Sequence, residues 1–138
     1  MIAKAYADMT EKEKEQLIKA QQGELDAVIL YRKLAELINE AENKALFLKI
    51  ASDEGKHANI LRKYTGENLE PKNLKSVIVT NIYKVFGIKI MLKILARGEF
   101  KAANKYSSLV KKFPDIQEII KDENIHGKSM QDMAINLK

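Results

Sequence analysis

Hydrophobic residues recur every three to four positions along nearly the whole chain, and this spacing is the period of amphipathic α-helices. Four long stretches share the pattern, so the sequence predicts four principal helices. They run from Thr10 to about Asn39, from about Asn39 to Tyr64, through a third stretch that ends near Lys112, and from Pro114 to the C-terminus.

The ends of the first two predicted helices carry capping residues. Thr10 followed by Glu13 is a capping box, in which each side chain bonds the backbone N–H of the other residue. Asn39 with Glu42 could begin the second helix in the same way, and Gly66 could end it. The short connection between these two helices predicts an antiparallel hairpin.

Breaks in the pattern separate the remaining elements. Residues 67–73 (ENLEPKN) predict a loop, because a proline and a polar cluster interrupt the spacing. The third stretch is interrupted near Gly87, which would allow a separate short helix around 74–84 before it. Residues 113–115 (FPD) stop one helix and start the next, with Pro114 suited to the first helical turn.

The chain has the length and composition of one helical domain. It has 138 residues, of which 46% are hydrophobic, six are Gly and two are Pro. Two helical hairpins joined by a crossover predict an all-α four-helix bundle, and residues 1–138 are predicted to form a single domain. The absence of cysteine excludes disulfides, thiolate metal sites and cysteine nucleophiles.

Each predicted helix carries one glutamate in the middle of its apolar seam. The only two histidines stand three residues after two of these glutamates, in DEGKH (53–57) and DENIH (122–126). A Glu-x-x-His pair places both side chains on one face of a helix, one turn apart. The six candidate metal ligands are Glu24, Glu54, His57, Glu99, Glu123 and His126.

Four buried carboxylates need a cation, because even one buried charge is costly and four would repel one another. No lysine or arginine lies near this layer on the seams. Two divalent ions would match the four carboxylates, and this ligand arrangement is that of di-iron and di-manganese bundles. Mixed carboxylate and imidazole ligands suit iron or manganese better than structural zinc. A lone seam glutamate is more often a rim residue, so the prediction depends on the joint placement.

Four segments of the chain resemble the ferritin-like superfamily, in particular its rubrerythrin-type and bacterioferritin-type di-iron proteins. The resemblance spans nearly the whole chain and implies a ferritin-like bundle with two iron ions per chain, for which manganese or zinc could substitute. The segments are GELDAVILY (23–31), SDEGKHANIL (52–61), ARGEFKAANKY (96–106) and KDENIHGK (121–128).

The resemblance implies a role for each ligand. It implies that Glu54 and Glu123 bridge the two metals. Glu24 and Glu99 would be terminal ligands. His57 and His126 would bind one metal each.

The aspartate beside each Glu-x-x-His motif also has an implied role. Asp53 would hold His126, and Asp122 would hold His57. Such carboxylates fix the imidazole tautomer and raise its basicity. The alternative is that both aspartates are ordinary acids on the helix surface.

Two tyrosines occupy matched positions in the two halves. Tyr31 and Tyr106 each follow a terminal glutamate by seven residues, and helical side chains lean toward the N-terminus, so both could reach the carboxylate layer. Their hydroxyls could bond ligands, or both could be ordinary core aromatics. The matched spacing suggests an internal pseudo-two-fold repeat.

Two features depart from the rubrerythrin pattern. Rubrerythrins have a further Glu three residues after the terminal ligand of the third helix, and Ala102 stands there. Without cysteine there is no rubredoxin domain, so electrons would come from a separate protein such as a rubredoxin. Compared with bacterioferritin, a tight connection before the last helix and no helix after it favour a homodimer over a cage.

The resemblance implies reduction of H2O2 or O2 at the di-iron site, in oxidative-stress defence or iron handling. A ferroxidase that stores or delivers iron has the same ligands and stays open. A non-catalytic, metal-stabilised bundle is the alternative from another class, and it predicts no turnover.

Charge and hydropathy bear on location and partners. The net charge is +5, and most lysines alternate with acids, which argues against a nucleic-acid partner. Lysines interrupt the most apolar region, 76–95, which argues against a membrane span. The N-terminus has no apolar stretch typical of a signal peptide, so a cytoplasmic location is predicted.

Overall fold

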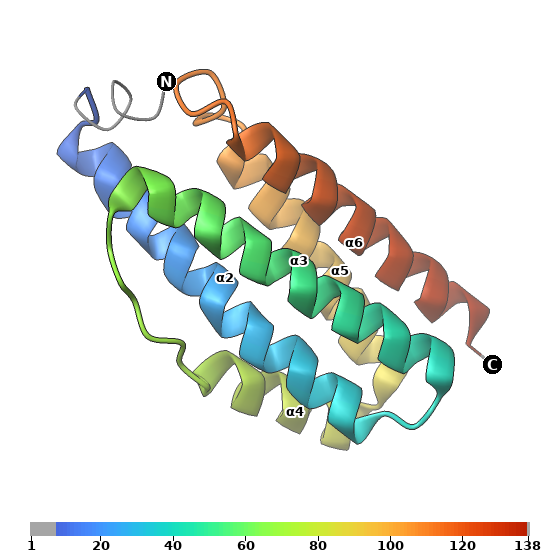
Figure 1. The fold of residues 1–138 in the computed structure, drawn as a ribbon. Helices are drawn as coiled ribbons and strands as arrows, with labels where there is room; N and C mark the ends of the chain where they lie inside the picture. Colours follow the sequence, from blue (N-terminus) through green and yellow to red (C-terminus); the bar gives the residue numbers. More distant parts are fainter. Residues whose placement is uncertain (1–7, 138) are drawn as a thin grey trace.

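The computed structural model describes residues 8–137, and every regular element in that part is a helix. The long helices α2, α3, α5 and α6 form a bundle, and the short helix α4 lies outside it along one half of α2 (Figure 1). The predicted all-α bundle, with a short helix in the crossover, is confirmed. The helices are α2 (Glu11–Leu37), α3 (Ala41–Thr65), α4 (Leu74–Phe86), α5 (Ile88–Tyr106) and α6 (Ile116–Asn136).

The bundle consists of two hairpins, α2–α3 and α5–α6. The hairpins approach each other most closely between α3 and α6, whereas no Cα atoms of α2 and α5 lie within 8 Å of each other. Helix α4 packs against both α2 and α5. It therefore covers part of the wider seam between the hairpins.

The two apolar clusters of the core lie toward opposite ends of the bundle. One joins α2, α3, α5 and α6 with Val79 of α4, and the other is built around Leu17, Tyr64 and Phe113. The Tyr64 and Phe113 rings meet edge to face at 5.0 Å between centroids. The six predicted ligands fall between these clusters along each helix, so the polar layer is closed off at both ends.

The caps of α2 and α3 agree with the sequence in two of three cases. Both hydrogen bonds of the Thr10–Glu13 capping box are present, at 2.9 and 3.1 Å. Gly66 ends α3 with φ 68°, a left-handed conformation that glycine adopts without a steric penalty. The predicted cap at Asn39 is wrong, because the N-cap of α3 is Glu40. The buried Ile38 is extended after α2, and α3 begins only at Ala41.

The C-terminal end of α5 differs from the prediction. The helix stops at Tyr106, six residues before Lys112, and turns follow to position 115. The hydroxyl of Ser107 donates to the carbonyl of Asn104 at 2.6 Å, a side-chain bond that competes with regular helix geometry.

The hydrophobic spacing nevertheless continues through these turns. Leu109 and Phe113 are buried although the backbone is no longer α-helical. The hydrophobic pattern therefore predicted the burial of these two side chains correctly but their α-helical backbone incorrectly. Helix α6 begins at Ile116, so Pro114 lies before the helix. The prediction that Pro114 occupies the first helical turn is therefore wrong.

Candidate metal centre

All six predicted ligands are buried in one layer of the bundle. Helix α2 contributes one glutamate and α5 another, while α3 and α6 each contribute a glutamate and a histidine. No member is more than 5% exposed. The residues are Glu24, Glu54, His57, Glu99, Glu123 and His126.

The six side chains form two overlapping groups of four. One group is Glu24, Glu54, His57 and Glu123, and the other is Glu54, Glu99, Glu123 and His126. Within each group the candidate ligand atoms lie within 4.8 Å of one another. Glu54 and Glu123 belong to both groups, which is the arrangement that two carboxylates between neighbouring metal ions require.

The distances inside each group fit a small cation. His57 Nδ1 lies 3.2 Å from Glu54 Oε1 and from Glu123 Oε1. His126 Nδ1 lies 3.3 to 3.5 Å from carboxylate oxygens of Glu54, Glu99 and Glu123. Ligand atoms held tetrahedrally about 2.1 Å from an ion would be roughly 3.4 Å apart. The spacing within both groups is therefore that of atoms around a metal ion.

Five of the six side chains have an inward atom with no hydrogen-bond partner. Buried polar atoms normally find a partner, so five orphans at one place call for an explanation. A bound cation would satisfy all of them at once, and the residues therefore fit a metal centre. The atoms are Glu24 Oε2, Glu54 Oε1, His57 Nδ1, Glu123 Oε1 and His126 Nδ1.

The outward nitrogen of each imidazole meets an aspartate from the opposite hairpin. His57 Nε2 lies 2.8 Å from Asp122 Oδ2, and His126 Nε2 lies 2.8 Å from Asp53 Oδ2. A proton on Nε2 that is donated to the aspartate leaves the lone pair of Nδ1 directed at the carboxylate layer. Each hairpin thus orients the histidine of the other.

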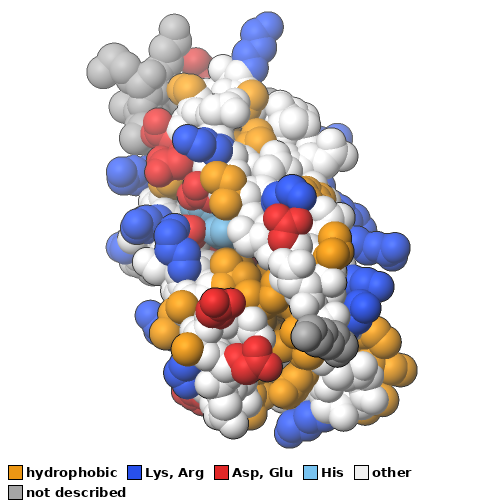
Figure 2. All heavy atoms as spheres, turned by 90° about the vertical axis from the view of Figure 1, so that its right-hand side faces the viewer, with side chains coloured by type: hydrophobic (Ala, Val, Ile, Leu, Met, Phe, Trp, Pro, Cys, Tyr) orange, Lys and Arg blue, Asp and Glu red, His pale blue; other side chains and the backbone are white. Residues whose placement is uncertain are grey.

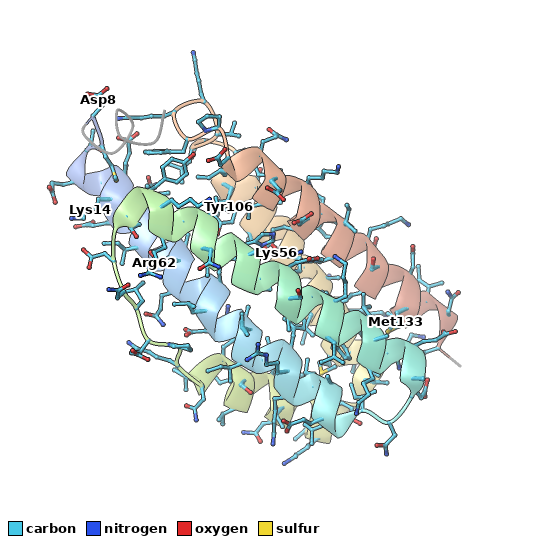
Figure 3. All side chains as sticks on the ribbon, in the orientation of Figure 1. Asp8, Lys14, Lys56, Arg62, Tyr106 and Met133 are labelled. Atoms are coloured by element: carbon cyan, nitrogen blue, oxygen red, sulfur yellow. The ribbon has the colours of Figure 1, made fainter. Side chains whose placement is uncertain are left out.

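The two tyrosine hydroxyls also cross between hairpins. Tyr31 on α2 donates to Glu99 on α5 at 3.1 Å, and Tyr106 on α5 donates to Glu24 on α2 at 2.9 Å. Side chains such as Tyr106 occupy the interior between the hairpins (Figure 3). These bonds join α2 and α5 across the seam where their backbones are far apart. The crossed pairing itself was not predicted, since sequence spacing cannot show which carboxylate a ring reaches.

One aspartate has a further partner that the sequence analysis missed. Lys49 Nζ lies 2.7 and 2.8 Å from the two carboxylate oxygens of Asp53, one helical turn away. Burial acts to raise the pKa of Asp53, but hydrogen bonds from His126 and Lys49 outweigh it and hold that pKa below its usual value. The Lys49–Asp53 spacing of four was the signal available in the sequence.

Crowding of the carboxylates changes their protonation. Burial, aided by the neighbouring Glu123 charge, raises the pKa of Glu24 to about 7 and that of Glu99 to about 7. Burial works against a charge on His126, but the carboxylates of Glu123 and Glu54 raise its pKa to about 12. Without a metal the layer therefore retains protons, and a metal ion would displace them.

One face of the molecule gives a limited view of this layer. Figure 2 shows histidine atoms in view between acidic, basic and hydrophobic side chains, although neither histidine is more than 3% exposed. The side chain of Asp122 is 26% exposed, whereas that of Asp53 is 8% exposed. The aspartate that holds His57 is therefore the more exposed one, although His57 itself is 0% exposed.

A comparison with protein families identifies the kind of centre. The model of the Rubrerythrin family matches residues 15–134, a range that includes all six candidate ligands. The chain belongs to the rubrerythrin family. Searches of curated proteins and of solved structures gave no match. Rubrerythrins bind iron, and the two groups of buried carboxylates and histidines in this member could hold metal ions.

Proposed function

We propose that this rubrerythrin-family protein reduces H2O2 or O2 at two iron ions held by the six buried residues. The observation that carries the proposal is the pair of four-residue groups that share Glu54 and Glu123. Each ferrous ion would supply one electron, so a pair could complete the two-electron reduction of peroxide.

The surrounding residues would position the ligands and control protons. Tyr31 and Tyr106 hold the two terminal carboxylates, and Asp53 and Asp122 hold the imidazoles. Apolar clusters close the layer at both ends, which limits the access of water to the centre. The partly exposed Asp122 is the group best placed to exchange a proton with solvent.

Electrons would come from a separate donor protein, such as a rubredoxin in the cytoplasm. The chain has no cysteine and therefore no thiolate redox centre of its own.

A second candidate function is ferroxidase activity in iron storage or delivery. Position 102, three residues after Glu99, is alanine and adds no carboxylate to the layer. Ala102 is partly buried and packs against the apolar cluster around Phe113. A centre with only six ligands favours release of oxidised iron, because no additional carboxylate is present to retain it.

The two functions can be separated by loading the protein with Fe(II) without oxygen and mixing it with H2O2 or with O2. Faster oxidation by H2O2, followed by repeated turnover with a reductant and no loss of iron, would support peroxide reduction. Faster oxidation by O2 with transfer of Fe(III) to a chelator would favour ferroxidase activity instead.

A matched pair of variants controls this experiment. Glu123→Ala removes a residue shared by both groups and should abolish both reactions. Ala102→Glu adds the missing carboxylate and should slow iron release. A wild-type protein that binds iron but reacts with neither oxidant would contradict both functions and indicate a structural metal centre.

A further inference from the structure

One segment of the chain carries cationic side chains and no acidic ones. Residues 71–98 contain six lysines and arginines and no aspartate or glutamate, whereas the rest of the chain has 18 cationic and 19 acidic residues. The expected alternation of lysines with acids therefore fails in this segment. All six cations are exposed, and none forms an ion pair with another described residue. They are Lys72, Lys75, Lys84, Lys89, Lys93 and Arg97.

Helix α4 within this segment exposes several large apolar residues to solvent and buries few, unlike an ordinary surface helix. Its buried residues are Ser76, Val79 and Thr80, two of which are polar. The hydroxyl of Thr80 is buried without a hydrogen-bond partner. Ile82 and Tyr83 are partly buried against the core, whereas five other large apolar residues of α4 point outward, each between 48% and 73% exposed. They are Leu74, Val77, Ile78, Val85 and Phe86.

These outward residues form a stripe along the helix. At 100° per residue, Leu74, Ile78 and Val85 fall within about 40° of one another, opposite the buried Ser76. Lys75 and Lys84 lie on the two flanks of this stripe. Figure 1 shows α4 at the edge of the bundle, with no other described helix over its outer side. We define this outward surface of α4, with its flanking lysines, as the α4 face.

We infer that the α4 face binds the surface of a membrane containing anionic phospholipids. An interfacial helix inserts an apolar stripe among the acyl chains while flanking lysines contact phosphate groups, and the α4 face offers both features. Phe86, the last residue of α4, lies about 100° to one side of the stripe, is 61% exposed and can enter the boundary region as an aromatic anchor. No helix in residues 8–137 is long and apolar enough to cross a membrane.

Charge distinguishes this partner from the alternatives. A two-fold contact between copies of the chain would place lysines of one α4 face near those of the other, with no carboxylate in 71–98 to offset them. Nucleic acid would match the cations but not the apolar stripe, because its backbone offers charge and no acyl surface. An anionic bilayer matches both.

Flotation of the iron-loaded full-length protein with lipid vesicles tests the inference. Vesicles of equal parts phosphatidylcholine and phosphatidylglycerol should bind at least roughly tenfold more protein than pure phosphatidylcholine. Ile78→Gln with Val85→Gln should reduce that binding at least roughly tenfold, and salt should weaken it in part. Ile125→Gln with Ile135→Gln is the matched control, because these exposed α6 residues lie outside the α4 face, and it should bind like wild type.

Several results would overturn the inference. Equal binding to both vesicles, no binding, or equal loss in both double variants would each exclude the α4 face as an anionic-lipid site. Sedimentation velocity without lipid supplies a further check. A dimer that only the α4 variant converts to monomers would show that a second copy covers this face. Binding to DNA that the α4 variant retains in full would identify a purely electrostatic site.

Discussion

The two hairpins supply equivalent ligands but place them in different surroundings. His126 is held by Asp53, which is nearly buried and also paired with Lys49. His57 is held by Asp122, which is partly exposed and has Glu118 at the position that corresponds to Lys49. The two hairpins are therefore more alike in the residues that contact the centre than in the residues that support those contacts.

This difference suggests that the two halves of the centre, the group that contains His57 and the group that contains His126, differ in how firmly they hold a metal ion. The Asp53–His126 pair is suited to holding a metal ion firmly, because Lys49 and His126 together hold both carboxylate oxygens of Asp53. Asp122 is the more exposed of the two aspartates, at 26%, and has no lysine partner to fix it, so it should hold His57 less firmly. Substitutions in and around the centre can show how far the two groups are equivalent.

The largest effect should come from the residues common to both halves. Glu54→Ala or Glu123→Ala should remove both metal ions, since each glutamate belongs to both groups. Glu24→Ala and Glu99→Ala each affect one group and should leave about one ion per chain. Metal content after gel filtration measures this. Retention of one ion by Glu54→Ala would show that the halves are independent.

The aspartates should separate the halves. Asp53→Asn and Asp122→Asn keep the size of the side chain but weaken its hold on the imidazole, which typically costs about 10- to 100-fold in metal affinity. The buried Asp53 should give the larger loss, near 100-fold, and the partly exposed Asp122 the smaller, near tenfold. Competition with a chelator measures both affinities, and equal losses would remove the proposed asymmetry.

The stability of the metal-free protein should fall as pH rises. The pKa of Glu24 and of Glu99 is about 7 in the folded chain against a usual 4.5, so their protonated forms favour folding below pH 4.5 and that contribution is lost as pH rises to 7. The melting temperature without metal should therefore decrease from pH 5 to pH 8, and excess zinc should reverse the trend because metal binding releases protons.

A double variant controls this pH effect. Glu24→Gln with Glu99→Gln removes both titrating groups and should flatten the metal-free profile between pH 5 and pH 7. A slope unchanged from wild type would show that other groups control stability in this range.

The packing of the second hairpin should be less tolerant of added volume. A Cβ at Gly127 would lie 2.8 Å from the Phe100 ring, whereas the matching position on α3 is already an alanine, Ala58. Gly127→Ala should therefore destabilise the protein by about 1–3 kcal/mol. Gly98→Ala is the control, because its Cβ meets nothing within 4 Å, and it should stabilise by up to about 1 kcal/mol. Denaturant unfolding distinguishes them.

The smallest effect should come from Lys49. Lys49→Gln leaves Asp53 with His126 as its only partner among the contacts described above, so the Asp53–His126 pair would resemble the Asp122–His57 pair. The lysine side chain is 67% exposed, and a surface ion pair contributes about 0–1 kcal/mol, so metal affinity should change by less than about fivefold. A change as large as that of Asp53→Asn would show that Lys49 is essential for holding His126.

Much of the fold was readable because local signals and burial agreed. Thr10, Glu13 and Gly66 act through their own backbone neighbours, so their caps were predictable. The end of α5 was not, because Leu109 and Phe113 keep the core spacing after the helix has ended. Periodicity records which side chains are buried, and several backbone conformations can bury the same side chains.

Polar contacts over long sequence separations were only partly predictable. Gln21 stands on an otherwise apolar seam, and it donates to the carbonyl of Glu67 and accepts from Thr65. This network attaches the start of the crossover to α2, but the sequence shows only a polar residue in an apolar pattern. The six candidate ligands stood out because the same exception occurs on all four helices, and their role as ligands remains a prediction.

The most direct test of this role is the metal content of protein loaded anaerobically with Fe(II) and freed of excess metal. We expect about two iron ions per wild-type chain and none in Glu123→Ala. Wild-type protein without stoichiometric metal, with iron, manganese and zinc each offered in turn, would contradict it and leave four buried glutamates to be explained by protonation alone.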